Sequence, residues 1–188
     1  MSTTTTPLLP GYFYHIYNRG INKEVIFKDD ENYRYFLQLM GKYLNPIILV
    51  YAYCLLPNHF HILISPMIAD KDKLHLPLSH LFNTYTQSFN RRYNRTGALF
   101  ERPFKRKQIM DETYLWQVIC YIHNNPDHHY LGAFDRYPWS SYLSLSSKKP
   151  TLLKRDFVLS LFGGYQDFIT AHENEVELRH IRDYLIEK

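Results

Sequence analysis

The chain has 188 residues, of which 45% are apolar and 21% charged, a composition that supports a folded core and excludes wholesale disorder. Its net charge of +4 is a mild basic bias, which fits a polyanionic partner without requiring one. The two cysteines show no Cys-x-x-Cys spacing, so the sequence indicates neither a disulfide framework nor a thiolate zinc site.

The sequence shows no targeting or membrane-spanning pattern. The longest apolar run, residues 47–56, is far shorter than the roughly 20 residues that span a bilayer. Residues 1–10 are rich in Thr and lack the basic start and apolar stretch of a signal peptide. We therefore expect a cytoplasmic protein that does not enter a membrane.

The first elements are a strand and a helix. Residues 12–18 are rich in aromatic and branched side chains and end at Arg19-Gly20, a pattern that predicts a strand followed by a turn. Asp29 and Asp30 then precede apolar residues at helical spacing, and Asn45-Pro46 ends that pattern. The spacing predicts a helix between these two signals.

A hairpin follows. Residues 47–56 form a continuous apolar run, which is typical of a strand covered on both faces. Pro57-Asn58 is a turn signal that leads directly into the second strand, residues 59–65.

Two helical patterns flank a short basic strand. Apolar residues recur at steps of three and four from Leu78 to Tyr93, which predicts a helix. Residues 104–110 predict a strand, and Asp111-Glu112 opens a third helix that Pro126 is expected to stop. This order of elements favours an α+β fold: a ferredoxin-like antiparallel sheet with helices packed on one face.

The remainder of the chain is predicted to be a C-terminal helical appendage. It holds too little apolar surface for an independent core, so we expect Trp139 and Tyr142 to dock on the main domain and the end to be partly mobile. The predicted organisation is a flexible N-terminus over residues 1–10, a main domain over 11–131 and the docked appendage over 132–188.

His59 and His61 are candidate metal ligands. Side chains alternate across a strand, so both imidazoles project from one face while Phe60 points to the other. Two imidazoles at this spacing can share one metal ion. The alternative is that two histidines alternate by chance in a half-exposed strand.

Tyr121 and Asn125 lie four residues apart near the end of the third predicted helix and therefore on one face. A tyrosine hydroxyl can act as a nucleophile, and an amide oxygen can bind a hard metal ion. The alternative is a tyrosine at the edge of the core followed by an asparagine that caps the helix before Pro126. Because a residue before proline is biased away from helical geometry, Asn124 is the second choice for the amide ligand.

Charge is concentrated in residues 91–107. This segment carries seven basic side chains and one acid, Glu101, a net charge of +6. Aromatic residues alternate with the cations, a mixture that can hold a phosphodiester backbone while bases stack on the rings. We predict DNA contacts here, although a solvated surface is the alternative; the basic residues are Arg91, Arg92, Arg95, Arg102, Lys105, Arg106 and Lys107.

Five motifs occur in order along the chain. They are Tyr14-His15-Ile16-Tyr17-Asn18-Arg19-Gly20, Leu56-Pro57-Asn58-His59-Phe60-His61-Ile62-Leu63, Phe89-Asn90-Arg91-Arg92-Tyr93, Phe100-Glu101-Arg102-Pro103-Phe104-Lys105 and Tyr121-Ile122-His123-Asn124-Asn125-Pro126. Together they resemble the REP-associated tyrosine transposases, which belong to the single-tyrosine branch of the HUH single-strand DNA endonucleases. The match covers residues 12–131, continues into Trp139-Ser140-Ser141-Tyr142, and is loose after Pro150.

The resemblance implies a role for each site residue. His59 and His61 are then metal ligands, Tyr121 is the nucleophile, and Asn125 is the third ligand, where related insertion-sequence transposases carry Gln. Residues 11–131 become the HUH catalytic domain. This mixed nitrogen and oxygen ligand set fits Mg²⁺ or Mn²⁺.

The activity implied is metal-dependent cleavage and rejoining of single-stranded DNA beside palindromic repeats that fold as hairpins, through a 5′-phosphotyrosine intermediate. The partner is single-stranded or hairpin DNA, and a monomer is favoured over a homodimer because the appendage can cover the surface that would otherwise pair. A domesticated regulator that binds hairpin DNA without cutting it is the main alternative. A nicking enzyme of replication or conjugation and a zinc hydrolase are further alternatives, the latter using His123, His128 or His129.

Overall fold

A four-stranded antiparallel sheet forms the centre of the computed structural model, which describes residues 6–69 and 71–173. The strands are hydrogen-bonded in the order β2-β3-β1-β4. Along the chain the main elements follow as strand, helix, strand, strand, helix, strand, which is the ferredoxin-like order. The strand bounds are β1 Phe13–Arg19, β2 Ile48–Leu56, β3 His59–Pro66 and β4 Lys105–Ile109. The predicted fold class is confirmed.

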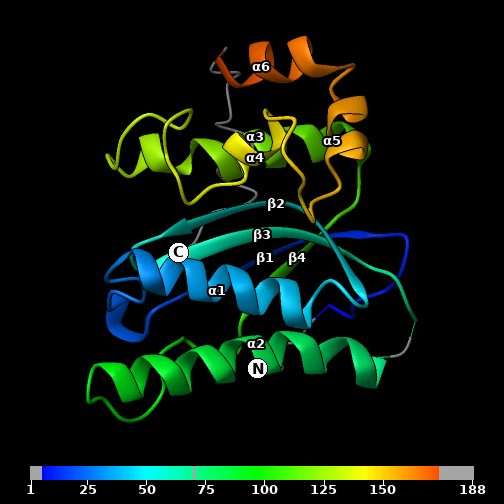
Figure 1. The fold of residues 1–188 in the computed structure, drawn as a ribbon. Coiled ribbons are helices and arrows are strands. Elements are labelled where there is room, and N and C mark those ends of the chain that lie inside the picture. Colours follow the sequence, from blue (N-terminus) through cyan, green and yellow to red (C-terminus); the bar gives the residue numbers. More distant parts are fainter. Residues whose placement is uncertain (1–5, 70, 174–188) are drawn as a thin grey trace.

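Two helices, α1 (Asp30–Tyr43) and α2 (Lys71–Arg92), cover one face of the sheet (Figure 1). The predicted start of α1 is confirmed, since the Asp29 carboxylate accepts a hydrogen bond from the Asn32 backbone N–H at 3.1 Å. Alternate strand residues pack beneath these helices in a dense aromatic and aliphatic core; among them are Tyr14, Ile16, Phe60, Ile62 and Ile64.

The third helix, α3 (Glu112–His128), lies on the opposite face of the sheet (Figure 1), whereas the sequence pattern placed the helices on one face. The reason is visible in β2, which is apolar on both faces, and in Leu63 of β3. Ala52, Cys54 and Leu63 point away from α1 and α2 and are fully buried with the apolar side of α3. A sheet with two apolar faces must cover both.

Pro126 does not stop α3, contrary to the sequence expectation, and the helix continues to His128. The proline lies in the last turn, so its missing N–H removes one helical hydrogen bond close to the point where the pattern ends anyway. The turn closes because the His129 N–H donates to the Asn125 carbonyl at 3.0 Å and the Leu131 N–H donates to the Pro126 carbonyl at 2.9 Å.

The C-terminal part packs over α3 and along the outer edge of β2. Its helices are α4 (Tyr142–Leu145), α5 (Arg155–Leu161) and α6 (Tyr165–Glu173). Trp139 stacks on Tyr33 with ring centroids 4.6 Å apart, and Tyr142 is buried against α3. The charged run expected to be helical up to residue 188 lies outside the described residues from residue 174 onward.

The described N-terminal residues also contact the core. Leu8 is buried, and the Leu9 N–H donates to the Tyr14 hydroxyl at 2.9 Å. Among the helices of residues 6–69 and 71–173, none is both long and apolar enough to cross a membrane.

Candidate metal and nucleophile site

The two histidines of β3 face α3, on the side of the sheet opposite the main aromatic core. Because side chains alternate along the strand, Phe60 between them points into the core under α1 and α2. His59 is 5% exposed and His61 is 1% exposed. Their rings lie at a right angle, with centroids 5.2 Å apart. The predicted placement of both imidazoles on one face is confirmed.

Each of these imidazoles is oriented by a hydrogen bond at Nδ1. The side-chain oxygen Oδ1 of Asn58 lies 2.6 Å from His59 Nδ1, and because an amide oxygen only accepts, His59 carries its proton on Nδ1. His15 Nε2 on the neighbouring strand β1 lies 2.9 Å from His61 Nδ1. Such bonds set the tautomer and aim the second nitrogen, as the outer partners of metal-bound histidines do.

The opposite nitrogens of this pair have no hydrogen-bond partner. His59 Nε2 and His61 Nε2 are both buried and unpartnered among the described residues, and the same is true of His15 Nδ1. A buried lone pair without a donor is costly unless it binds something else. The two Nε2 atoms therefore fit a divalent metal ion.

Burial also keeps these rings neutral. Removal from water lowers the pKa of His59 to about 3, with smaller contributions from His129 and Arg19, and lowers the pKa of His15 to about 3. The pKa of His61 is lowered well below its ordinary value for the same reason. A neutral imidazole is the form that binds a metal ion, so the pair is ready to bind at neutral pH.

Tyr121 and Asn125 project from α3 toward these histidines. The Tyr121 ring centroid is 5.7 Å from that of His61 and 6.3 Å from that of His15, in both cases edge to face. Asn125 lies one turn later, between Tyr121 and His129, whose ring centroid is 4.6 Å from that of His59. The structure thus brings His59, His61 and Tyr121 together, and the helical spacing places Asn125 on the same side of α3 as Tyr121.

The amide of Asn125 has one end engaged by its own helix. Its Nδ2 donates to the Tyr121 carbonyl at 2.7 Å, so the amide oxygen is the end turned away from that carbonyl. Asn124, the second choice, is one residue round the helix and has a buried oxygen without a partner among the described residues. Within residues 6–69 and 71–173, no three His, Cys, Asp or Glu side chains are grouped to hold a metal.

The sequence did not identify Asn58 and His15 as hydrogen-bond partners of His59 and His61. Asn58 was interpreted as a turn residue, and His15 was named only within the first motif. The signal for Asn58 was its position next to His59. No signal located His15 beside His61, because the pairing of Tyr17 with His61 in the β1–β3 register brings them together.

The basic segment is divided between ion pairs and open surface. Arg92 pairs with Asp29 and Glu31 of the α1 start, and Arg95 pairs with Glu24 at 2.5 Å. In the β1–β4 register, Lys105 lies opposite Tyr17 and Lys107 opposite His15, so both lysines are on the histidine side of the sheet. Arg106 lies over the Phe104 ring on the other side. Arg91 and Arg102 are exposed.

Comparison with known proteins gives a likeness to a solved structure. No family model and no curated protein sequence matches the chain. A solved structure described as a REP-associated tyrosine transposase bound to a REP hairpin superposes with a TM-score of 0.60 at 14% sequence identity, covering 80% of this chain and 88% of that chain. At this identity the likeness establishes the shared fold.

Proposed function

We propose that this protein is a metal-dependent transposase or endonuclease that cleaves and rejoins single-stranded DNA near hairpin-forming palindromic repeats through a 5′-phosphotyrosine. One observation carries the proposal: two neutral, buried imidazoles present unpartnered Nε2 atoms beside a tyrosine on a facing helix. The transposase with the same fold was solved bound to a REP hairpin, which supports this choice of substrate.

His59, His61 and the Asn125 oxygen would hold the metal ion, either Mg²⁺ or Mn²⁺. Bound there, the ion supplies Lewis-acid polarisation of the scissile phosphate and neutralises its charge. The roles of the chain's own residues follow from their positions: Asn58 and His15 hold the ligand rings in place, and α3 sets the distance between the ligands and Tyr121.

Tyr121 is the nucleophile in this proposal. Its hydroxyl oxygen attacks phosphorus and loses its proton, the bond to the 3′ oxygen breaks, and that oxygen takes up a proton to become a free 3′-hydroxyl. The new phosphotyrosine is still a phosphodiester, so attack by another 3′-hydroxyl restores a DNA strand and releases the tyrosine. Cleavage and rejoining therefore need no ATP.

The basic side chains on the histidine side of the sheet would hold the strand. Lys105 and Lys107 of β4 lie across from Tyr17 and His15, and Arg102 is exposed just before them. We assign the catalytic domain to residues 11–131 and the docked appendage to 132–188, and we propose that the monomer is the active species.

The test is a denaturing gel of the protein incubated with labelled hairpin DNA and Mn²⁺. We expect a labelled band at protein mass that EDTA abolishes, that Tyr121→Phe lacks, and that Tyr114→Phe, an exposed tyrosine on the same helix, retains. Adduct formation by Tyr121→Phe would overturn the assignment of the nucleophile. Tight hairpin binding with no adduct on any repeat or metal would instead indicate the domesticated DNA-binding regulator.

A further inference from the structure

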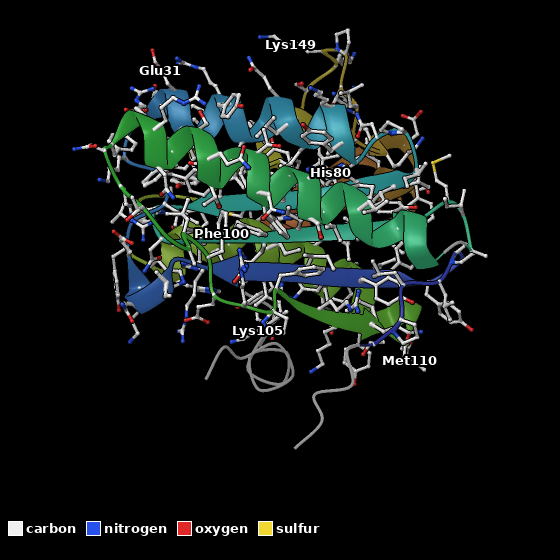
Figure 2. The ribbon with its side chains drawn as sticks, turned by 90° about the horizontal axis from the view of Figure 1, so that it is seen from below. Glu31, His80, Phe100, Lys105, Met110 and Lys149 are labelled. Carbon is white, nitrogen blue, oxygen red and sulfur yellow. The ribbon has the colours of Figure 1, made fainter. Side chains whose placement is uncertain are left out.

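A cavity of about 470 Å³ lies between α2 and the segment 99–104, on the side of the sheet away from the histidines. Phe100, labelled in Figure 2, lies between α2 and β1 in this view, and Lys105 follows it at the start of β4. A volume of this size is typical of a small-ligand site. His59, His61, Tyr121 and Asn125 do not line it.

One wall of the cavity is aromatic. Phe82 of α2 lies with its ring centroid 5.5 Å from that of Phe100 and 5.5 Å from that of Phe104. The first two rings are buried in the core and therefore rigid, whereas Phe104 is half-buried. Such a wall offers a flat ligand both edge and face contacts.

The helix that carries Phe82 also contributes polar side chains to the cavity. Ser79, Asn83 and Thr86 recur at helical spacing along α2 and line the cavity, with Asn83 exposed at its rim. Hydroxyl and amide groups can donate and accept hydrogen bonds, which is what the edge of a nucleobase requires. Aromatic rings and hydrogen-bonding groups around one cavity suit a flat heterocycle.

The cavity is connected to the proposed cleavage site through the end of β1. Glu101 lines the cavity, and its N–H donates to the Arg19 carbonyl at 3.0 Å while its carboxylate pairs with the Arg19 guanidinium at 2.5 Å. Arg19 in turn is the strand partner of His59. Within the sheet, Glu101 thus lies about two strand spacings, roughly 10 Å, from His59, and a DNA strand would pass around this end of β1 to reach the histidines on the other face.

Positive charge surrounds this connection. Arg102 lines the cavity and is exposed, and the Arg106 guanidinium lies 5.6 Å from the centre of the Phe104 ring. The Arg106 Nε is buried without a hydrogen-bond partner among the described residues. A flat ligand attached to a phosphate backbone would meet both the rings and the charges.

We propose that this cavity takes up one unpaired nucleobase of the DNA strand that is cut at Tyr121. This inference rests on the proposed function and adds to it a base-binding site remote from the chemistry. The phosphates flanking the bound base run past Arg102 toward the histidines, so the cavity sets which phosphodiester reaches Tyr121.

The experiment is an abasic scan. Hairpin DNA with single-stranded flanks carries one abasic residue at each unpaired position in turn, and the affinity is measured by fluorescence anisotropy in EDTA. We expect a single position at which the abasic site weakens binding roughly ten-fold, the size of one lost base–aromatic stacking contact.

Two variants link that position to the cavity. Thr86→Trp fills the cavity, so intact and abasic DNA should bind it with equal, lower affinity; Asn83→Ala, at an exposed position that preserves folding, should reduce the discrimination part of the way. The matched control is Gln87→Trp, which places the same ring on the exposed neighbouring residue of α2 and should keep the full ten-fold difference.

The outcomes separate the two proposals. Equal binding of all abasic substrates by the wild type, or an unchanged ten-fold difference in Thr86→Trp, overturns the base-binding site even when the Tyr121 adduct forms on the same DNA. A position-specific effect that Thr86→Trp removes, without any adduct, supports the site and overturns the cleavage reaction instead.

Discussion

The two faces of one sheet differ sharply in what their buried side chains do. Under α1 and α2, alternate residues of β1 and β3 are aromatic or aliphatic; Tyr14, Ile16, Phe60 and Ile62 are all fully buried there. Under α3, the residues between them include three buried histidines, His15, His59 and His61. Of their six ring nitrogens, three take part in hydrogen bonds and three have no partner among the described residues.

Alternate residues of β1 and β3 therefore have different roles: those that face α1 and α2 stabilise the fold, and those that face α3 form the candidate site. The apolar face gains free energy from each buried side chain, whereas the histidine face gives up part of that gain by burying polar atoms without partners. Unpartnered buried polar atoms cluster where ligands bind. The same strands therefore build a rigid support on one side and a site on the other.

The largest expected effect tests this division at neighbouring residues. Phe60→Ala should cost about 3–5 kcal/mol of unfolding free energy, because the ring packs against Phe36, Phe82 and Phe100 in a core that cannot collapse around the hole. His61→Ala should cost less than about 2 kcal/mol, because it also removes an unpartnered nitrogen. Urea unfolding in EDTA measures both; equal losses would contradict the division.

The next effect concerns the partners of the ligand pair. His15→Ala and Asn58→Ala should each weaken Mn²⁺ binding by about 10- to 100-fold, because each removes the hydrogen bond that orients a ligand ring. Binding of Mn²⁺ is followed by electron paramagnetic resonance, without DNA or turnover. His80→Ala, an exposed histidine on α2, is the control. Unchanged affinity in both variants would show that the rings need no such support.

A third prediction concerns a second pair of buried histidines, which lies outside the candidate site. His123 Nδ1 lies 2.7 Å from His172 Nε2, and His123 Nε2 lies 2.7 Å from the Ser141 hydroxyl, which joins α3, α6 and the segment after α3. Burial lowers the pKa of His172 to about 4 and that of His123 well below its ordinary value. Below about pH 6.5 the unfolded chain therefore binds protons that the folded chain does not.

The free energy of unfolding is therefore highest above about pH 6.5 and falls as the pH drops toward 4, by about 1.4 kcal/mol per buried histidine at pH 5.5. Unfolding free energies at pH 7.5 and 5.5 measure this loss. His172→Gln should be less stable at pH 7.5 but should lose about 1.4 kcal/mol less than the wild type on acidification. An identical loss in the two proteins would exclude His172 as a contributor.

The smallest effect distinguishes paired from open basic residues. Arg92→Ala should leave the free energy of unfolding nearly unchanged, since its ion pairs lie at the solvent-exposed surface, and should leave DNA affinity nearly unchanged because Asp29 and Glu31 already neutralise its charge. Arg102→Ala should instead reduce the slope of log affinity against log salt by about 0.7, the value for one single-strand phosphate contact. A larger slope change for Arg92→Ala would reverse this assignment.

Much of the site was predictable from local sequence. The alternation of His59, Phe60 and His61 fixes which two side chains share a face, since the strand period is two. The spacing of Tyr121 and Asn125 likewise places them together on a helix. Both patterns depend on a few covalently linked residues, and periodicity also predicted every strand and the three long helices.

Tertiary structure alone decided how those pieces meet. Residues far apart in the chain make each of these contacts. Helix α3 covers the second face of the sheet, His15 lies beside His61, and Arg92 and Arg95 pair with acidic side chains. Each depends on strand register or on the burial of a second apolar face, which local propensity does not encode. The sequence by itself determined the strands, the long helices and which side chains share a face of each element. The packing of α3 on the sheet determined that these side chains form one site.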